Sequence, residues 1–145
     1  MKKYFVFTMI ALATSFIGSQ AFAGTPIGHL DAINPATAGW ACTSGESTTS
    51  TFVQVYLDVN GVGTHIITLP AIRPSEKAVA DACGVPYGAL GTKAYRFAIA
   101  LKDLTAAIKA RGVKTGTYSM YVYAVNMSGA YSLLANSVGQ KIYVP

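Results

Sequence analysis

Two histidines are the side chains of this sequence best suited to acid–base chemistry. His29 and His65 are its only histidines, and imidazole exchanges protons readily near neutral pH. His29 lies two residues before Asp31, so a histidine–carboxylate pair could activate a serine that the fold brings close. The chain has no Gly-x-Ser-x-Gly sequence, and a single histidine on a strand is usually a surface residue. A small hydrolase using His29 or His65 is therefore an alternative function, and we expect no catalytic residue.

One short stretch resembles the start of a calcium-binding loop. Residues 58–61 read Asp-Val-Asn-Gly, but a calcium loop needs a glutamate about six residues after the glycine. Residues 66–68 are Ile-Ile-Thr instead. The pair Asn60-Gly61 is also the one that tight β-hairpins prefer. We therefore predict a hairpin turn here, and expect neither a metal site nor a cofactor.

Tyrosines are the most prominent candidates for ligand contact. The chain has nine, and all but one follow residue 23. Tyr121 and Tyr123 alternate with apolar residues, and Tyr56 does so on an earlier strand. Exposed aromatic rings stack on sugars and partner proteins, although tyrosines also commonly fill cross-strand pairs in sheets. Tyr56, Tyr121 and Tyr123 are the candidate binding residues, and both interpretations stay open.

The two cysteines predict a disulfide. Cys42 and Cys83 are the only cysteines, an even number that suits an oxidising compartment. The bridge would close about forty residues and stabilise the fold by about 2–4 kcal/mol. Two buried thiols or a redox pair are the alternatives, but a redox pair usually has the spacing Cys-x-x-Cys.

Alternating apolar residues indicate a chain built mainly of strands. We expect strands over residues 27–32, 38–42, 52–58, 64–72, 95–101, 117–125, 131–135 and 141–144. Because strand side chains repeat every two residues, Trp40 and Cys42 share a face. We therefore expect Trp40 to pack near the disulfide. Tyr118 should face inward and make a hydrogen bond at a corner of the sheet. Residues 43–51 are mostly Ser, Thr and Gly, which predicts a polar loop.

Two short helices interrupt the strands. Ser75 is placed to cap the first, which would run to about Cys83 and stop at Gly84. Asp103 could cap the second, which Gly112 would end. The sequence thus predicts an all-β protein with two short helices, arranged as an antiparallel sandwich of about seven strands.

The N-terminal segment has the layout of a cleaved secretory signal. Lys2 and Lys3 precede an apolar run, and a small-residue site, Ala21-Phe22-Ala23, precedes Gly24. We therefore predict a signal peptide over residues 1–23 and one domain over residues 24–145, periplasmic or secreted. No membrane span is expected after cleavage.

Charge excludes one class of partner. Lys2 and Lys3 belong to the predicted signal, so their removal lowers the net charge from +5 to +3. The remaining basic residues are scattered between Arg73 and Lys141, whereas nucleic-acid-binding proteins cluster them. We expect no nucleic-acid partner.

The order of short motifs resembles a known class of module. Residues 28–31 read Gly-His-Leu-Asp and residues 39–42 read Gly-Trp-Ala-Cys, similar to the G-x-L-D…G-W-A opening of immunoglobulin-like β-sandwich modules in secreted and cell-surface bacterial proteins. Later motifs of that class have counterparts in Val53-Gln54-Val55-Tyr56, Arg73, Ala78-Val79-Ala80, Tyr95-Arg96-Phe97 and residues 116–124. The resemblance implies an immunoglobulin-like sandwich in an extracytoplasmic setting. Such modules are often appended to polysaccharide-handling proteins, so it also implies sugar binding by association.

The leading functional prediction is a small exported non-catalytic module that binds a glycan or an envelope protein, or has a structural role. An inhibitor or assembly factor acting through a strand edge is a second possibility. The sequence does not determine the ligand or the oligomeric state.

Overall fold

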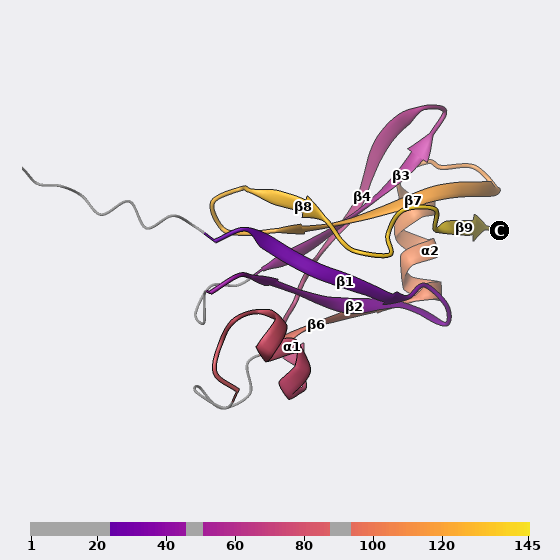
Figure 1. The fold of residues 1–145 in the computed structure, drawn as a ribbon. Coiled ribbons are helices and arrows are strands. Elements are labelled where there is room, and N and C mark those ends of the chain that lie inside the picture. The colour runs from indigo at the N-terminus through magenta and orange to yellow at the C-terminus, as the bar shows by residue number, and fades with distance from the viewer. Residues whose placement is uncertain (1–23, 46–50, 88–93) are drawn as a thin grey trace, which may run out of the picture.

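Two antiparallel sheets face each other and form an all-β sandwich (Figure 1). The computed structural model describes residues 24–45, 51–87 and 94–145. The predicted signal peptide, residues 1–23, and residues 46–50 of the predicted polar loop lie outside the described residues. The described chain has nine strands against about seven expected. Part of this difference is β5, a pair of residues that follows the expected strand 64–72 and that no expected range included.

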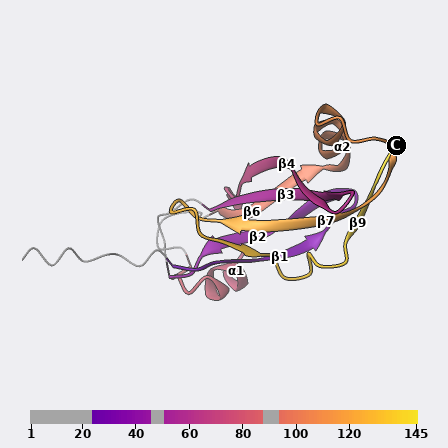
Figure 2. The same ribbon diagram turned by 90° about the horizontal axis from the view of Figure 1, so that it is seen from above.

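The first sheet has the strand order β1-β2-β6-β5 and the second has the order β4-β3-β7-β8, with β9 also pairing with β7. The first is built from β1 (Pro26–Ala32), β2 (Ala36–Thr43), β6 (Ala94–Ala100) and β5 (Arg73–Pro74). The second is built from β4 (Val62–Pro70), β3 (Phe52–Val59), β7 (Gly116–Val125), β8 (Tyr131–Leu133) and β9 (Lys141–Val144). The helices are α1 (Lys77–Ala82) and α2 (Leu101–Ala110), which lie apart from each other in both views (Figure 1 and Figure 2).

Side chains that alternate along the strands fill the space between the sheets. Alternate residues of β3, β7 and β6 are buried, and two residues of α2 join the same cluster. They are Val53, Val55, Leu57, Met120, Val122, Ala124, Phe97, Ile99, Leu104 and Ile108. The strand period of two therefore predicted this core correctly, and α2 covers part of it.

Both helices start at different residues from those predicted. The first begins after Glu76, not after Ser75, and the Glu76 side chain makes no capping hydrogen bond. It pairs with Arg96 instead. The second begins at Leu101, a residue expected to end strand β6, so Asp103 lies in its first turn and does not cap it. The carboxylate there still suits the positive end of the helix dipole.

The β3–β4 hairpin turns where the sequence predicted. Asn60 and Gly61 both have positive φ, 57° and 79°, as a two-residue turn that matches strand twist requires. Asp58 Oδ1 accepts a hydrogen bond of 2.7 Å from the Gly61 backbone N–H. The turn residues are thus used for backbone geometry and local hydrogen bonding.

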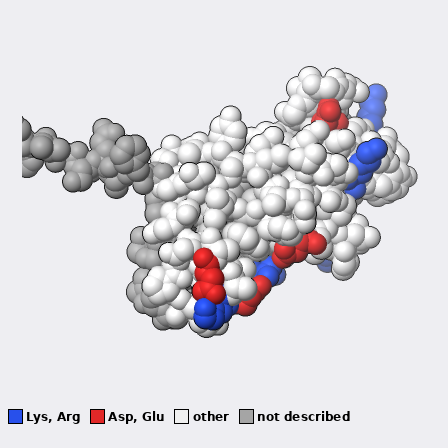
Figure 3. Space-filling view, in the orientation of Figure 1, with Lys and Arg blue, Asp and Glu red and all other residues white. Residues whose placement is uncertain are grey.

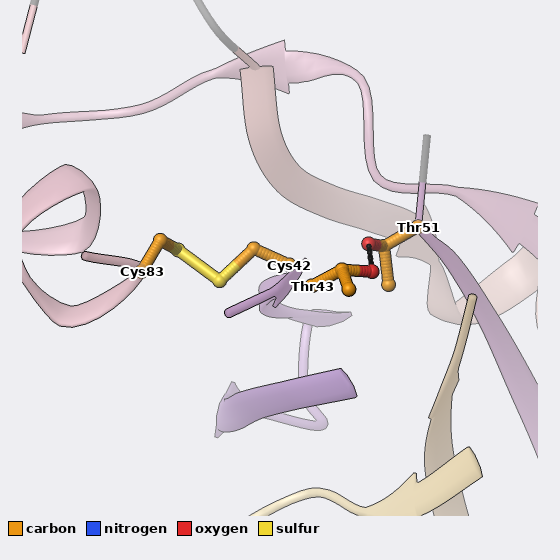
Figure 4. Close-up of a disulfide and its surroundings, with 4 residues drawn as sticks. All are labelled: Cys42, Thr43, Thr51 and Cys83. Atoms are coloured by element: carbon orange, nitrogen blue, oxygen red, sulfur yellow. Dashed lines mark hydrogen bonds between the residues drawn. A yellow bond between two sulfur atoms is a disulfide. The ribbon is translucent and has the colours of Figure 1, made fainter. Parts of the chain in front are cut away.

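The disulfide joins β2 to the end of α1. Cys42 and Cys83 are bonded, with their Cα atoms 6.1 Å apart, and both are fully buried (Figure 4). They belong to a second, smaller apolar cluster with Val79, Ala80, Val85 and Tyr95, against which Trp40 packs. The predicted position of Trp40 is therefore confirmed. This cluster holds α1 against the first sheet.

Two buried threonines anchor the ends of the segment that the sequence predicted as a polar loop. The hydroxyls of Thr43 and Thr51 lie 3.1 Å apart and form a hydrogen bond (Figure 4). Both side chains are buried. Each end is therefore fixed next to the disulfide, because Thr43 follows Cys42 directly.

Backbone hydrogen bonds between the sheets close one side of the sandwich. Leu30 N–H donates to Ala135 O at 2.9 Å, and Ala135 N–H donates to Gly28 O at 3.1 Å. A Cβ at Gly28 would lie 2.3 Å from the Trp40 carbonyl oxygen of β2 and 2.6 Å from a side-chain carbon of Leu134. Glycine is therefore required where β1 lies between these two neighbours. The edge of β1 is therefore occupied by the segment that follows β8.

Tyr118 makes the predicted corner hydrogen bond. Its hydroxyl donates to the Lys114 carbonyl at 2.9 Å, and its ring packs against the main core. The side chain thereby ties the start of β7 to the turn that follows α2.

Loss of the disulfide should destabilise the fold without preventing its formation. A Cys42→Ala, Cys83→Ala variant is expected to lose about 2–4 kcal/mol of unfolding free energy, because its unfolded chain is no longer cross-linked. Thermal unfolding followed by circular dichroism measures the change. A reducing agent should lower the Tm of the native protein and leave that of the variant unchanged. An equal response of both proteins would contradict a structural role for the bond.

Removal of the Tyr118 hydroxyl should cost about 1 kcal/mol, since one hydrogen bond to a backbone carbonyl is lost while the ring remains. Urea unfolding of Tyr118→Phe gives the value. Tyr143 is 62% exposed on β9, so Tyr143→Phe is the matched control and should unfold like the native protein. Equal stability of the two variants would contradict the role of the corner hydrogen bond.

Candidate functional site

The three tyrosines singled out from the sequence lie together on the outer face of the second sheet. Tyr56, Tyr121 and Tyr123 line one surface groove of about 430 Å³. We call it the tyrosine groove; the described residues that line it are Gln54, Tyr56, Asp58, Gly61, Gly63, Tyr121, Tyr123 and Tyr131. These residues come from four neighbouring strands and the β3–β4 turn.

Strand register explains why these side chains meet. Tyr56 of β3 is directly opposite Tyr121 of β7, and Gln54 is opposite Tyr123. Their neighbours Val55 and Val122 are also paired and point into the core. Because successive strand residues face opposite sides, the register that buries the valines places the tyrosines outside.

The rings pack edge to face. Tyr56 and Tyr123 have ring centroids 5.6 Å apart at 88°, and Tyr123 and Tyr131 have centroids 6.0 Å apart at 78°. This is the preferred geometry for aromatic pairs and contributes about 0.5–1.5 kcal/mol per pair beyond area burial. The rings therefore support one another, and the groove walls are held in place before any ligand arrives.

The groove contains hydrogen-bonding groups with capacity to spare. The Tyr56 hydroxyl donates to Gln54 Oε1 at 3.0 Å, which orients the Gln54 amide and leaves its NH₂ as a donor. Asp58 uses Oδ1 for the turn, and its second oxygen remains an acceptor. Donors and acceptors are thus fixed at separate points along β3.

Two glycines leave space at the turn end of the groove. Gly63 pairs with Asp58 across the hairpin. A Cβ built at Gly61 or Gly63 would meet no atom within 4 Å. The surface beside the Asp58 carboxylate is consequently open. The tyrosine rings and this carboxylate line the same groove.

Several lining residues were not predicted as site residues. Gln54 and Asp58 alternate with Tyr56 along one strand, so the period of two could have found them once Tyr56 was chosen. Tyr131 lies on a separate strand, β8, and is 72% exposed. Its contact with Tyr123 depends on the pairing of β8 with β7, which the sequence does not reveal.

The two histidines lie on different sheets. His65 packs against Tyr56, with ring centroids 5.2 Å apart, and its Nε2 lies 3.1 Å from Thr68 Oγ1. His29 Nδ1 lies 2.9 Å from Asp31 Oδ1, so the histidine–carboxylate pair forms. His29 Nε2 is contacted by the Asn136 amide nitrogen at 2.8 Å. In a hydrolytic triad this nitrogen would contact the serine.

Arg96 connects two acidic residues on the outer face of the first sheet. Its guanidinium contacts Glu76 at the start of α1 and Asp31 of β1, the latter at 2.5 Å. Lys77 and Asp81 form a further pair at 2.7 Å on α1. Figure 3 shows acidic and basic groups alternating across this side of an otherwise mainly uncharged face. The contacts join α1 to β6 and β1.

These contacts shift the pKa of both main partners. Hydrogen bonding from Arg96 lowers the pKa of Glu76 from 4.5 to about 2. Hydrogen bonds to Glu76 and then Asp31 raise the pKa of Arg96. Each partner therefore favours the charged form of the other.

Two of the edge strands, β1 and β4, are occupied or interrupted. β1 is paired with the segment after β8. Along β4 the register shifts opposite Val55 and Tyr56, and Ile66 is the extra residue of this bulge. Arg111 at the end of α2 donates to the Ile66 carbonyl at 3.3 Å. Bulges and covering side chains both obstruct pairing with another strand.

Comparison with known proteins adds no relative: no family model, curated protein or solved structure matches the chain.

Within residues 24–45, 51–87 and 94–145, no three His, Cys, Asp or Glu side chains gather as a metal site would require. The two helices of that part of the chain, with six and ten residues, are too short to cross a membrane.

The Glu76–Arg96 contact should make stability depend on acid pH. The folded-state pKa of Glu76 lies near 2, below its ordinary value of 4.5. The contact therefore contributes its full stabilisation above about pH 4.5 and loses it as the pH falls toward 2. Thermal unfolding of the native protein and of Glu76→Gln from pH 7 to pH 2 tests this.

The Tm difference between the two proteins should be largest near neutral pH and vanish at the acid end. Asp103→Asn is the control: it removes an exposed carboxylate that interacts with the dipole of α2, so its Tm difference from the native protein should change less with pH than that of Glu76→Gln. A difference between native protein and Glu76→Gln that stays constant with pH would contradict the assignment.

Proposed function

We propose that this protein is an exported, non-catalytic binding module that recognises a glycan through the tyrosine groove. The observation that supports the proposal is the convergence of Tyr56, Tyr121, Tyr123 and Tyr131 on one groove that also presents polar groups. Tyrosines scattered over a sheet would need no function. Four on one concave surface, beside an oriented amide and a carboxylate, match the composition of a ligand site.

Saccharides suit this combination of groups. A sugar ring carries C–H groups on its faces and hydroxyls around its rim, so it packs against aromatic rings while its hydroxyls bond to polar side chains. The tyrosine rings supply the apolar surface. The Gln54 amide and the Asp58 carboxylate supply a donor and an acceptor. The groove is open along the sheet surface, which suits a chain or chain end.

The strand order supports an immunoglobulin-like fold as part of the proposal. Immunoglobulin domains have one sheet in the order A-B-E-D and another containing C, F and G, extended by C′ in some types. The orders β1-β2-β6-β5 and β4-β3-β7-β8 correspond if β4 takes the place of C′. Tyr118, near the start of β7, bonds back to Lys114 as the tyrosine corner does on strand F. The disulfide departs from that pattern, because Cys83 follows α1 and is not on β7.

Export is the second part of the proposal. The Cys42–Cys83 bond supports it, because disulfides persist mainly in oxidising compartments. The predicted signal peptide and the glycan-rich cell envelope agree with this location. An envelope protein remains the alternative partner for the same face, since tyrosines also favour protein interfaces.

A glycan array with purified protein tests the proposal. The native protein should bind a subset of glycans, and a Tyr121→Ala, Tyr123→Ala variant should lose at least tenfold in affinity, because two ring contacts disappear. Tyr87 is 59% exposed outside the groove, so Tyr87→Ala is the matched control and should bind normally. Circular dichroism verifies that each variant is folded.

Failure of the native protein to bind any glycan would contradict the proposal and favour a protein partner. Equal affinity of the double variant and the native protein would place the site elsewhere. Cleavage of a bound glycan that His29→Ala or His65→Ala abolishes would support the hydrolase instead.

A further inference from the structure

We infer that the tyrosine groove selects amino sugars, with the protonated amine of the sugar placed at Asp58. This inference rests on the proposed function and specifies its ligand. Its basis is the charge of the groove, because Asp58 is the only one of the eight lining residues that carries a charge. The other seven are tyrosines, a glutamine and glycines.

An isolated carboxylate in such a groove discriminates between ligands by charge. Among the residues that the structure describes, no lysine or arginine lines the groove, so an anionic sugar bound there would face Asp58 without a lysine or arginine from that part of the chain. A neutral sugar would offer hydroxyl donors only. A hydroxyl that donates to the Asp58 carboxylate already makes a charge-assisted hydrogen bond, and a protonated amine adds to it the attraction between opposite charges, which is modest at an exposed site. The charge of the groove therefore ranks cationic above neutral and neutral above anionic ligands.

The carboxylate is held in place and has acceptor capacity left. Oδ1 accepts the Gly61 N–H at 2.7 Å, which fixes the side chain against the hairpin turn. The second oxygen is free to accept from a ligand, because an ionised carboxyl offers about four lone-pair sites. Since the side chain is already ordered, little conformational entropy is lost when an amine binds.

Space for the amine lies directly beside the carboxylate. Gly63 is the residue paired with Asp58 on β4, and a side chain built there would meet no atom within 4 Å. Gly61 leaves the turn equally open. A side chain at either position would project into the space that the substituent of a sugar ring needs. The two glycines thus permit a ligand group to reach the carboxylate.

The aromatic wall next to Asp58 favours the same ligand. Tyr56 is two residues from Asp58 on β3, so both project from the same face about 7 Å apart. Tyr121 is directly opposite Tyr56. A sugar ring on these tyrosines places a ring substituent within reach of Asp58. The same ring faces attract a cation through their π electrons.

Three tetrasaccharides of identical linkage test the inference: one of glucosamine, one of N-acetylglucosamine and one of glucose. Isothermal titration calorimetry at a pH where the amine is protonated gives the dissociation constants. The native protein should bind the glucosamine tetramer about three- to tenfold more tightly than either neutral tetramer. The gain is modest because the ion pair between the amine and Asp58 is partly exposed to solvent. Raising the salt concentration should reduce this preference.

Asp58→Asn is the decisive variant. Asparagine keeps an oxygen that can accept the Gly61 N–H and is well tolerated in turns, so the hairpin should be retained while the charge is removed. The variant should bind the two neutral tetramers as the native protein does and lose the preference for glucosamine. Asp103→Asn removes the same charge from α2 and should leave the preference intact.

The outcomes separate this inference from the function on which it rests. Equal binding of all three tetramers, or a glucosamine preference that survives in Asp58→Asn, would overturn amine selection and leave glycan binding standing. Failure of all three tetramers to bind a native protein that binds other glycans on the array would likewise overturn amine selection alone. An array without any bound glycan would overturn both.

Discussion

The antiparallel register between β3 and β7 is the constraint on which the rest of this structure depends. Val55 is paired with Val122, and Tyr56 with Tyr121. A slip by one residue would expose the valines and bury the tyrosines, because neighbouring strand residues face opposite sides. Burial of the apolar side chains therefore selects one register. The same choice assembles the tyrosine groove, so the stability of the core and the composition of the outer face have a single physical origin.

The sequence reveals features that depend on neighbouring residues, but reveals little about contacts between distant strands. The Asn60-Gly61 turn, the alternation in β3 and β7, and the position of Trp40 beside Cys42 all follow from neighbouring residues. The pairing of β7 with β3 does not, because some sixty residues separate them. Tyr131 was consequently not predicted as a residue of the groove. The helix starts were also misplaced, since Glu76 is engaged by Arg96 of a distant strand and Leu101 N–H bonds to Pro35 O.

The outer faces of the two sheets have different chemical characters. On the first, Arg96 links Asp31 to Glu76, and the cluster around the disulfide secures α1. These contacts satisfy that face internally. On the second, aromatic rings and a single carboxylate face solvent. Sheet proteins commonly have one solvated face, but here the face that no helix of residues 24–45, 51–87 and 94–145 covers is also the one rich in tyrosine. The exposed aromatic surface and the contacts that secure α1 thus lie on opposite sides of one core.

The bulge at Ile66 affects whether copies of the molecule can associate through the edge of the second sheet. An uninterrupted edge strand would let one copy of a sheet protein pair with the next and extend into a growing ribbon. The extra residue breaks the regular spacing of donors and acceptors along β4, and the Arg111 guanidinium already occupies a carbonyl there. Because the bulge obstructs pairing along β4, this edge does not extend the sheet from one copy to the next, and the aromatic face beside it can stay exposed without favouring fibres through that edge.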